Sequence, residues 1–331
     1  MEITSILVWS FISITVLFLL HKFFNGPMTS LGKNINLTNK IIVVTGANAG
    51  IGKEAAFALL EKGAKVIFAC RDEIRTNKLI NSISNLKLRG NAYFINLDLA
   101  NFRSIKSFVK EFQLRFGKLD ILINNAGGNF DKYSDRFGIE TTMLTNHIGP
   151  VYLTNLLIDN FKHQAKIINV SSYAHYFCTK SIIDDWVFDK VNKNNYKFWS
   201  MYSLSKMANI AHTKHLNNLF KEKDLSIKAA ALHPGTVRTE FFQKYESFIM
   251  KFLTVLTKPI SYLFFKGPVE GAQTTLHLVY LEYEDYVSGG YYSDCKVKNT
   301  NELVRNSHAM DKIMRKTNDI IDNYLSNWGS E

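Results

Sequence analysis

An apolar run followed by three glycines is the feature that most constrains how this chain can fold. Residues 41–44 read IIVV, which is typical of a parallel strand covered on both faces. Gly46, Gly50 and Gly52 follow, and residues 55–60 then supply the apolar face of a helix. A strand, a glycine turn and a helix can bind the pyrophosphate of a dinucleotide, because free backbone N–H groups lie at the positive end of the helix. Glycines also occur in such turns for steric reasons alone, so the rest of the chain must decide.

Composition narrows the class of protein. With 331 residues, 46% of them hydrophobic and 21% charged, the chain suits one large globular domain or two small ones. A net charge of +11 suits nucleic acid, an anionic membrane or phosphorylated ligands, but the sequence has no long basic block, so no nucleic-acid partner is expected. Cys70, Cys178 and Cys295 form no C-x-x-C pair, so we expect neither a metal site nor a disulfide framework.

The N-terminus predicts a transmembrane helix. Residues 3–20 read ITSILVWSFISITVLFLL and carry no charge. At about 1.5 Å per residue this run spans about 27 Å, enough for the bilayer of the endoplasmic reticulum. A cleaved signal peptide would show a basic start and a small-x-small site, so we favour a membrane anchor over residues 1–22. Lys22 and Lys33 follow the run, which predicts a catalytic domain on the cytosolic side of the endoplasmic reticulum membrane.

The remainder alternates between strand and helix patterns. After a juxtamembrane linker over residues 23–39, we expect strands that cover residues 41–44, 64–70, 92–97, 119–124, 165–170 and 226–232. Helices are expected between them, including residues 73–86 and 138–161. This alternation predicts an α/β doubly wound parallel sheet (Rossmann fold) in a single catalytic domain over residues 40–331. Polar clusters follow the strands, at the edge where open parallel sheets bind ligands.

Two of these polar positions suggest proton transfer. Tyr202 and Lys206 are four residues apart on an expected helix and therefore share one face. A neighbouring ammonium favours phenolate, so we expect Lys206 to lower the pKa of Tyr202 from about 10 towards neutrality. Ser172 follows an adjacent strand and can donate to the same substrate oxygen, although such serines also cap helices. Asn146 is expected to hold a water between Lys206 and solvent.

The combination of motifs resembles the short-chain dehydrogenase/reductase family, and within it the retinol dehydrogenase group. The resemblance covers residues 40–296, and its motifs are TGANAGIG at 45–52, ACRD at 69–72, LDL at 97–99, NNAG at 124–127, TNHIG at 145–149, NVSS at 169–172, YSLSK at 202–206 and HPGTV at 233–237. MANI at 207–210, GAQT at 271–274 and YSDC at 292–295 resemble the retinol dehydrogenase group more closely.

The resemblance implies a role for each matching residue. Tyr202 would be the general acid/base, Lys206 its partner and a ribose ligand, Ser172 the group that polarises the substrate carbonyl, and Asn146 the holder of a relay water. The implied cofactor site comprises Gly46, Asn48, Ala49, Gly50, Ile51, Gly52, Arg71, Asp98, Asn125, Ala126, Gly127, Tyr202, Lys206, Pro234, Gly235, Thr236 and Val237. The resemblance also leaves room for a homodimer.

Charge at the end of the second strand bears on the choice of cofactor. A site specific for NAD usually ends this strand in an acid that binds the ribose 2′-hydroxyl. Here Arg71 occupies the end, and a guanidinium suits the 2′-phosphate of NADP(H). Asp72 follows at once and leaves NAD(H) as the alternative. We expect NADP(H).

Residues 238–268 indicate the substrate class. This insert is rich in phenylalanine, leucine and isoleucine, which predicts a lid that either touches the bilayer or packs on the core. Together with the anchor, it favours a lipophilic substrate, with retinol/retinal first and a steroid or fatty aldehyde as alternatives. A non-catalytic binding protein on the same fold is the remaining reading. Extra length before Tyr202 is expected to place Trp186, Phe188, Tyr196 and Trp199 near the pocket mouth. Asn129 and Phe130, after the NNAG motif, are a second expected difference in the pocket wall.

Overall fold

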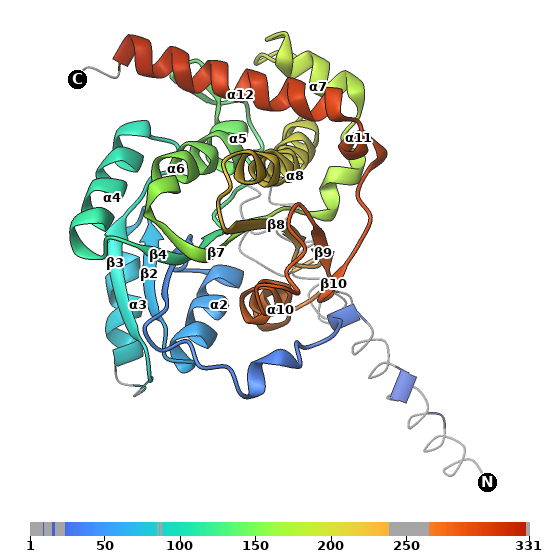
Figure 1. Ribbon diagram of the computed structural model, residues 1–331. Coiled ribbons are helices and arrows are strands. Elements are labelled where there is room, and N and C mark those ends of the chain that lie inside the picture. The colour runs from blue at the N-terminus through green and yellow to red at the C-terminus, as the bar shows by residue number, and fades with distance from the viewer. Residues whose placement is uncertain are drawn as a thin grey trace.

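A computed structural model describes residues 9, 15–16, 24–84, 86, 88–237 and 265–328 of the chain. Within them, an eight-stranded sheet runs in the order β10-β9-β8-β7-β4-β1-β2-β3 (Figure 1). Its strands are β1 (Ile41–Thr45), β2 (Lys65–Cys70), β3 (Asn91–Asn96), β4 (Leu119–Asn124), β7 (Phe161–Val170), β8 (Ile227–His233), β9 (Tyr291–Ser293) and β10 (Lys296–Val297). A separate hairpin pairs β5 (Asp135–Arg136) with β6 (Ile139–Glu140).

Parallel pairing dominates the large sheet. β1 lies between β2 and β4, where Val43 pairs with Ile67 on one side and Leu122 on the other. Every neighbouring pair is parallel except β9 with β10. Strand order reverses between β1 and β4, which is the position where open α/β sheets bind ligands. The predicted doubly wound parallel sheet is therefore confirmed.

Helices cover both faces of the sheet. The longer ones are α2 (Gly50–Glu61), α3 (Glu73–Ser84), α4 (Phe102–Arg115), α6 (Gly149–Leu157), α7 (Lys180–Val187), α8 (Phe198–Glu222), α10 (Pro268–Tyr280) and α12 (Ser307–Trp328). The shorter ones are η1 (Leu31–Lys33), α5 (Thr141–Met143), η2 (Leu144–Ile148), η3 (Ile158–Asn160), η4 (Tyr173–Phe177) and α11 (Glu302–Arg305). Two buried clusters separate the layers, because alternate side chains of each strand point to opposite faces.

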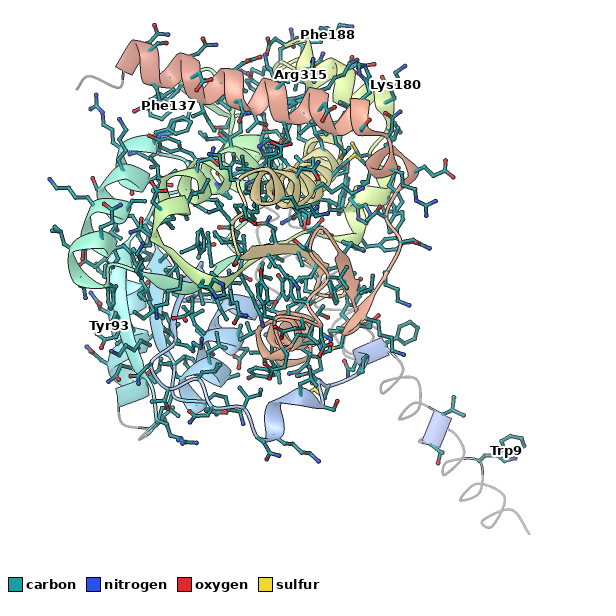
Figure 2. The ribbon with its side chains drawn as sticks, in the orientation of Figure 1. Trp9, Tyr93, Phe137, Lys180, Phe188 and Arg315 are labelled. Atoms are coloured by element: carbon teal, nitrogen blue, oxygen red, sulfur yellow. The ribbon has the colours of Figure 1, made fainter. Side chains whose placement is uncertain are left out.

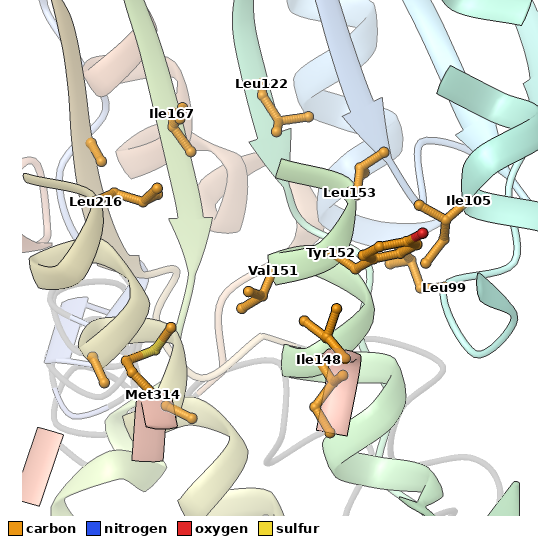
Figure 3. Close-up of a cluster of buried hydrophobic side chains, with 14 of the residues drawn as sticks. Leu99, Ile105, Leu122, Ile148, Val151, Tyr152, Leu153, Ile167, Leu216 and Met314 are labelled. Carbon is orange, nitrogen blue, oxygen red and sulfur yellow. The ribbon is translucent and has the colours of Figure 1, made fainter. Parts of the chain in front are cut away.

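The larger cluster lies under α4, α6 and α8 and continues beneath α12. Ile148, Val151 and Met314 of α12 belong to this cluster, and Figure 3 shows all three among its side chains. Tyr324 of the same helix packs on Phe102 with ring centroids 4.3 Å apart. α12 thus forms an outer layer over this face, as Figure 1 shows. The smaller cluster lies under α2 and α10 on the opposite face.

The expected helix over residues 138–161 is confirmed apart from its start, whereas the expected positions of Trp186 and Phe188 were wrong. The expected helix over residues 138–161 begins only at Thr141, because residues 135–140 form the β5–β6 hairpin, and it includes the π-helical turn η2. Residues 180–187 form α7, whose Trp186 is buried in the larger cluster instead of lying at a pocket mouth. Phe188 stands over Lys312 of α12, and Figure 2 shows it on the outside of the molecule. The apolar face of α7 packs toward α12, which buries Trp186 and brings Phe188 next to that helix.

The anchor and most of the lid lie outside the description. The described residues contain no helix that is both long and apolar enough to cross a membrane, and only three positions of the predicted span over residues 3–20 are among them. Of the predicted lid, residues 238–264 are likewise outside the described part. Both stay predictions from the sequence.

Candidate active site

The glycine turn joins β1 to α2. Gly46 has a φ of +66° and Gly50 a φ of +52°, a region that glycine enters at little cost. A Cβ atom on Gly52 would lie 2.4 Å from the amide nitrogen of Asn125 and 2.5 Å from the carbonyl oxygen of Gly46. Ala49 occupies the N-cap position of α2 but provides no side-chain hydrogen bond, and the first turn contains no acidic residue. The uncapped N-terminus of this twelve-residue helix therefore fits an anionic pyrophosphate.

Hydrogen bonds hold the turn against the neighbouring strand ends. The hydroxyl oxygen of Thr45 accepts the backbone N–H groups of Asn125 and Ala126 at 3.0 and 2.9 Å. The side-chain amide of Asn125 donates to the carbonyl of Thr45 at 2.9 Å. The N–H of Gly46 donates to Ala69 at the end of β2. The sequence motifs at residues 45–52 and 124–127 are thus brought together at the switch point.

At the end of β2, two adjacent charges have different environments. Asp72 accepts the backbone N–H of Arg75 at 2.9 Å, so its carboxylate caps the start of α3. Arg71 is exposed at the same end of the strand. Thr76 follows on α3, and its hydroxyl accepts the side-chain amide of Asn48 from the glycine turn at 2.9 Å. An arginine therefore faces solvent beside the turn, next to an acid that is already engaged.

Asp98 lies beyond the end of β3. One of its carboxylate oxygens accepts the N–H of Ala100 at 3.0 Å, and the other pairs with Arg136 of the hairpin at 3.0 Å. These bonds fix the orientation of the loop after β3. Its predicted contact with adenine stays a prediction.

A π-helical turn presents Asn146. In η2 the backbone loops out by one residue relative to an α-helix, a distortion that is frequent at functional sites. The side-chain oxygen of Asn146 accepts the N–H of Gly128, and its nitrogen donates to the carbonyl of Gly128, both at 2.8 Å. A Cβ atom on Gly127 would lie 3.2 Å from that side-chain oxygen and 3.3 Å from Nζ of Lys206. Asn146 and Lys206 therefore converge beside Gly127.

α8 carries the tyrosine and the lysine on one face. The ammonium of Lys206 lies 5.6 Å from the ring centroid of Tyr202 and donates to the carbonyl of Val170 at 3.1 Å. The Tyr202 hydroxyl is hydrogen-bonded to Ser172, which follows β7. The N–H of Ala174 donates to the Ser172 hydroxyl at 3.2 Å, so Ser172 also caps η4. The predicted group of four side chains is brought to one edge of the sheet.

The predicted direction of the tyrosine pKa shift was wrong. Burial raises the pKa of Tyr202 to about 12, and the hydrogen bond with Ser172 opposes that rise only in part. Burial also lowers the pKa of Lys206 to about 8. Removal from water disfavours both charged forms, and this outweighs the attraction that the spacing of four residues suggested. In this structure Tyr202 is therefore a phenol at neutral pH.

The turn after β8 packs against Lys266, a residue of the predicted lid. Gly235 has a φ of +90°, and a Cβ atom there would lie 2.4 Å from Cδ of Lys266. The N–H of Lys266 donates to the carbonyl of Thr236 at 2.9 Å. Its ammonium is buried and forms an ion pair of 2.6 Å with Asp294, just after β9. Lys266 lies near the end of the predicted lid over residues 238–268, and nothing in the sequence indicates that it returns to residues 234–237.

Aromatic side chains flank the reacting edge. Trp199 has its ring centroid 6.1 Å from that of Tyr202, and it is half exposed. Tyr173 follows Ser172 and is 55% exposed. The hydroxyl of Tyr196 donates to the carbonyl of Phe130 at 2.7 Å, so this tyrosine lies beside the loop at residues 129–130.

Comparisons with known proteins agree with this arrangement. A family model described as short chain dehydrogenase matches residues 40–180. Retinol dehydrogenase 12 of Bos taurus is 35% identical over 297 residues, which are 89% of each chain. Retinol dehydrogenase 11 of Mus musculus is 36% identical over 282 residues, which are 82% of each chain. The chain belongs to the short-chain dehydrogenase family. Within it, the chain falls in a retinol dehydrogenase-like group.

A solved structure supports the fold. An uncharacterized protein from Mycobacterium paratuberculosis matches with a TM-score of 0.68 over 88% of this chain and 97% of that chain, at 22% sequence identity. Membership in the family, which the relatives show, makes the chain a short-chain dehydrogenase oxidoreductase, and the fold implies a nicotinamide cofactor.

Proposed function

We propose that this protein is an NADP(H)-dependent oxidoreductase that interconverts a lipophilic alcohol and its carbonyl compound, with retinol and retinal as the first candidates. The observation that carries the proposal is the convergence of Ser172, Tyr202, Lys206 and Asn146 at the carboxyl edge of the sheet, beside an uncapped helix N-terminus. A binding protein without catalysis would need none of these side chains in register.

Each of these four side chains has a distinct role in proton transfer to the substrate. Ser172 and the phenol of Tyr202 donate hydrogen bonds to the carbonyl oxygen of the substrate, and Tyr202 gives up its proton as the alkoxide forms. Lys206 stabilises the resulting phenolate, and Asn146 holds the water that leads the proton in from solvent. When bound, the reduced nicotinamide supplies the hydride to the carbonyl carbon. A pKa of about 12 keeps Tyr202 protonated at neutral pH, which supports carbonyl reduction.

Two side chains support NADP(H) over NAD(H). An exposed guanidinium at Arg71 suits a 2′-phosphate, which it binds through two charge-assisted hydrogen bonds. Asp72 would repel that phosphate if it faced the ribose, but its carboxylate caps α3 instead. We therefore assign the 2′-phosphate to Arg71.

The substrate class rests on the relatives and on the site edge. Proteins named retinol dehydrogenase 12 and 11 share 35% and 36% sequence identity with this chain over 89% and 82% of its length. Exposed aromatic rings at Tyr173 and Trp199 beside the reacting edge suit a long apolar substrate. A steroid ketone or a fatty aldehyde remains the alternative of the same class.

The proposed location is the endoplasmic reticulum membrane, with the domain in the cytosol. Its support is the uncharged run over residues 3–20 and the lysines that follow it. Protease treatment of sealed microsomes tests this placement. Digestion of the domain supports it, and protection of the domain contradicts it.

NADPH oxidation by the full chain in detergent tests the activity. We expect turnover with all-trans-retinal, and comparison with a steroid ketone and a long-chain aldehyde ranks the substrates. Arg71→Glu should raise the KM for NADPH far more than that for NADH, whereas Arg89→Glu, at an arginine before β3, should change neither. No turnover with any of the three carbonyls would contradict the proposed function.

A further inference from the structure

The described segment that begins at residue 24 is fixed to the carboxyl edge of the sheet. A Cβ atom on Gly26 would lie 2.7 Å from the ammonium of Lys266 and 2.8 Å from a carboxylate oxygen of Asp294. Lys266 and Asp294 form the ion pair beside the turn after β8. Gly26 therefore packs directly on a pair of charges that borders the candidate active site.

From Gly26 the chain runs away from this edge along α10. The N–H of Thr29 donates to the side-chain oxygen of Gln273 at 3.1 Å, and its hydroxyl lies 3.3 Å from a ring nitrogen of His277. A Cβ atom on Gly32 would lie 3.0 Å from the ring of Tyr280, the last residue of α10. Because Gly26, Thr29 and Gly32 contact successively later residues between Lys266 and Tyr280, the chain runs away from the active-site edge after Gly26. The residues before Gly26 therefore join the domain at that edge. Figure 1 shows the described residues 24–25 beside β10.

Chain length limits how far the apolar N-terminal run can be from that edge. The uncharged run ends at Leu20, six residues before Gly26. Six fully extended residues reach at most about 20 Å. A bilayer that holds residues 3–20 must therefore have its surface within about 20 Å of the Lys266–Asp294 pair, on the same side as the candidate active site.

Side chains on this edge have the composition of a membrane-interface surface. Tyr173 is 55%, Phe177 68% and Val297 53% exposed. The hydroxyl of Tyr176 donates to the carbonyl of Asn299 at 2.6 Å, which joins η4 to the segment that follows β10. The lysines on either side of Val297, at 296 and 298, are exposed as well. Aromatic rings and lysines together suit the headgroup region of an anionic bilayer.

We propose that the carboxyl edge of the sheet, formed by η4 and the β9–β10 hairpin, docks on the bilayer surface. The surface is named here the edge patch and consists of Tyr173, Tyr176, Phe177, Lys296, Val297 and Lys298. A lipophilic substrate then passes from the membrane to Ser172 and Tyr202 without crossing bulk water. The inference rests on the membrane anchor within the proposed function, and not on the identity of the substrate or cofactor.

Depth-dependent quenching tests the docking. The full chain is placed in phosphatidylcholine vesicles that contain phosphatidylserine, with an NBD label on Phe177→Cys and, as the control, on Leu114→Cys. Leu114 is 80% exposed, near the end of α4 that leads into β4, so it lies at the opposite edge of the sheet. The unsubstituted chain, treated with label in parallel, gives the background from its native cysteines.

We expect lipids with a shallow doxyl quencher to reduce the emission of the label at 177 and to leave that at 114 unchanged. Equal quenching at both positions, or none at 177 in protein that floats with the vesicles, would overturn the proposal. Failure of the protein to float with vesicles would overturn it too. A label at 177 that is shielded without lipid quenching, in a protein that cross-links to a second copy, would overturn it in favour of a dimer interface.

Retinal reduction measured on the same samples separates this inference from the proposed function. Quenching at 177 without NADPH oxidation would retain the docking surface and remove the substrate assignment. NADPH oxidation without quenching at 177 would retain the substrate assignment and remove the docking surface.

Discussion

The ammonium of Lys206 lies 5.6 Å from the ring centroid of Tyr202, one helical turn along α8, and its hydrogen bond goes to the carbonyl of Val170. The lysine is therefore tied to the end of β7. Ser171 adds a second tie, because its hydroxyl donates to the carbonyl of Lys206 at 2.6 Å. The end of β7 thus sets where α8 presents both side chains, and Ser172 follows from the same strand end.

Removal of the Tyr202 hydroxyl should abolish turnover. In Tyr202→Phe the phenol can no longer donate its proton, and loss of a general acid lowers the rate by about 10²–10⁴-fold. Cofactor binding, followed by quenching of tryptophan fluorescence, should change little. Tyr93→Phe is the matched control, because Tyr93 lies on β3, well away from α8 in Figure 2. Full activity in Tyr202→Phe would rule out the mechanism.

Retinal reduction should slow as pH rises through about 8. Burial lowers the pKa of Lys206 to about 8, so its stabilising positive charge is present below that pH and is lost above it. Tyr202 keeps its proton over the same range, because its pKa is about 12. Lys206→Met should be slow at every pH and lack this inflection. Lys221→Met, an exposed position on the same helix, should retain it; an identical loss there would show that the inflection belongs to another group.

A side chain at Gly52 should block the cofactor cradle. The Cβ atom of Gly52→Ala would collide with the carbonyl of Gly46 at 2.5 Å, so the turn must shift. We expect a large rise in the KM for NADPH. Gly117→Ala is the control, because Gly117 has a φ of +71° but nothing within 4 Å of a Cβ atom. It should cost about 1 kcal/mol of stability and leave the KM unchanged. Equal KM values in both variants would contradict the cradle.

Local patterns predicted the sheet, and the edge of the sheet where the motif residues gather. Residues 41–44 have no polar side chain because β1 is covered on both faces, and this is visible in the sequence. Motifs far apart in the chain meet because each follows a parallel strand, and all such strands end at one edge. Thr45 binding to Asn125 and Ala126 is a direct result of that rule.

Features that depend on tertiary contact could not be predicted. No sequence pattern distinguishes the π-helical turn at Asn146 from an α-helix. The turn is stabilised by hydrogen bonds between the Asn146 side chain and the backbone of Gly128, which is distant in sequence. Trp186 was predicted to lie at the pocket mouth, because the sequence does not show that α12 packs on α7. The structure places Trp186 in the buried cluster. Lys266 lies at the end of an apolar insert, and nothing local indicates its ion pair with Asp294. The pKa of Tyr202 depends on burial, which spacing along a helix does not reveal.

The Lys266–Asp294 pair should contribute stability that disappears in acid. Burial opposes ionisation of Asp294, but the hydrogen bond and charge of Lys266 outweigh it and lower the pKa of this carboxyl. A carboxyl whose folded-state pKa is lowered stabilises the fold above its unfolded value of 3.8 and loses that effect as pH falls through the folded value. Asp294→Asn should therefore reduce the free energy of unfolding at pH 7, by about 1 kcal/mol or less, because the Asp294 side chain is 46% exposed and solvent screens its attraction to the buried ammonium.

Thermal unfolding followed by circular dichroism measures this effect. The difference in Tm between the unsubstituted chain and Asp294→Asn should shrink as pH is lowered below 3.8, because both then lack the carboxylate. Asp319→Asn, an exposed position on α12, is the matched control and should change Tm little at any pH. A difference for Asp294→Asn that stays constant across this pH range would show that the ion pair with Lys266 is not its cause.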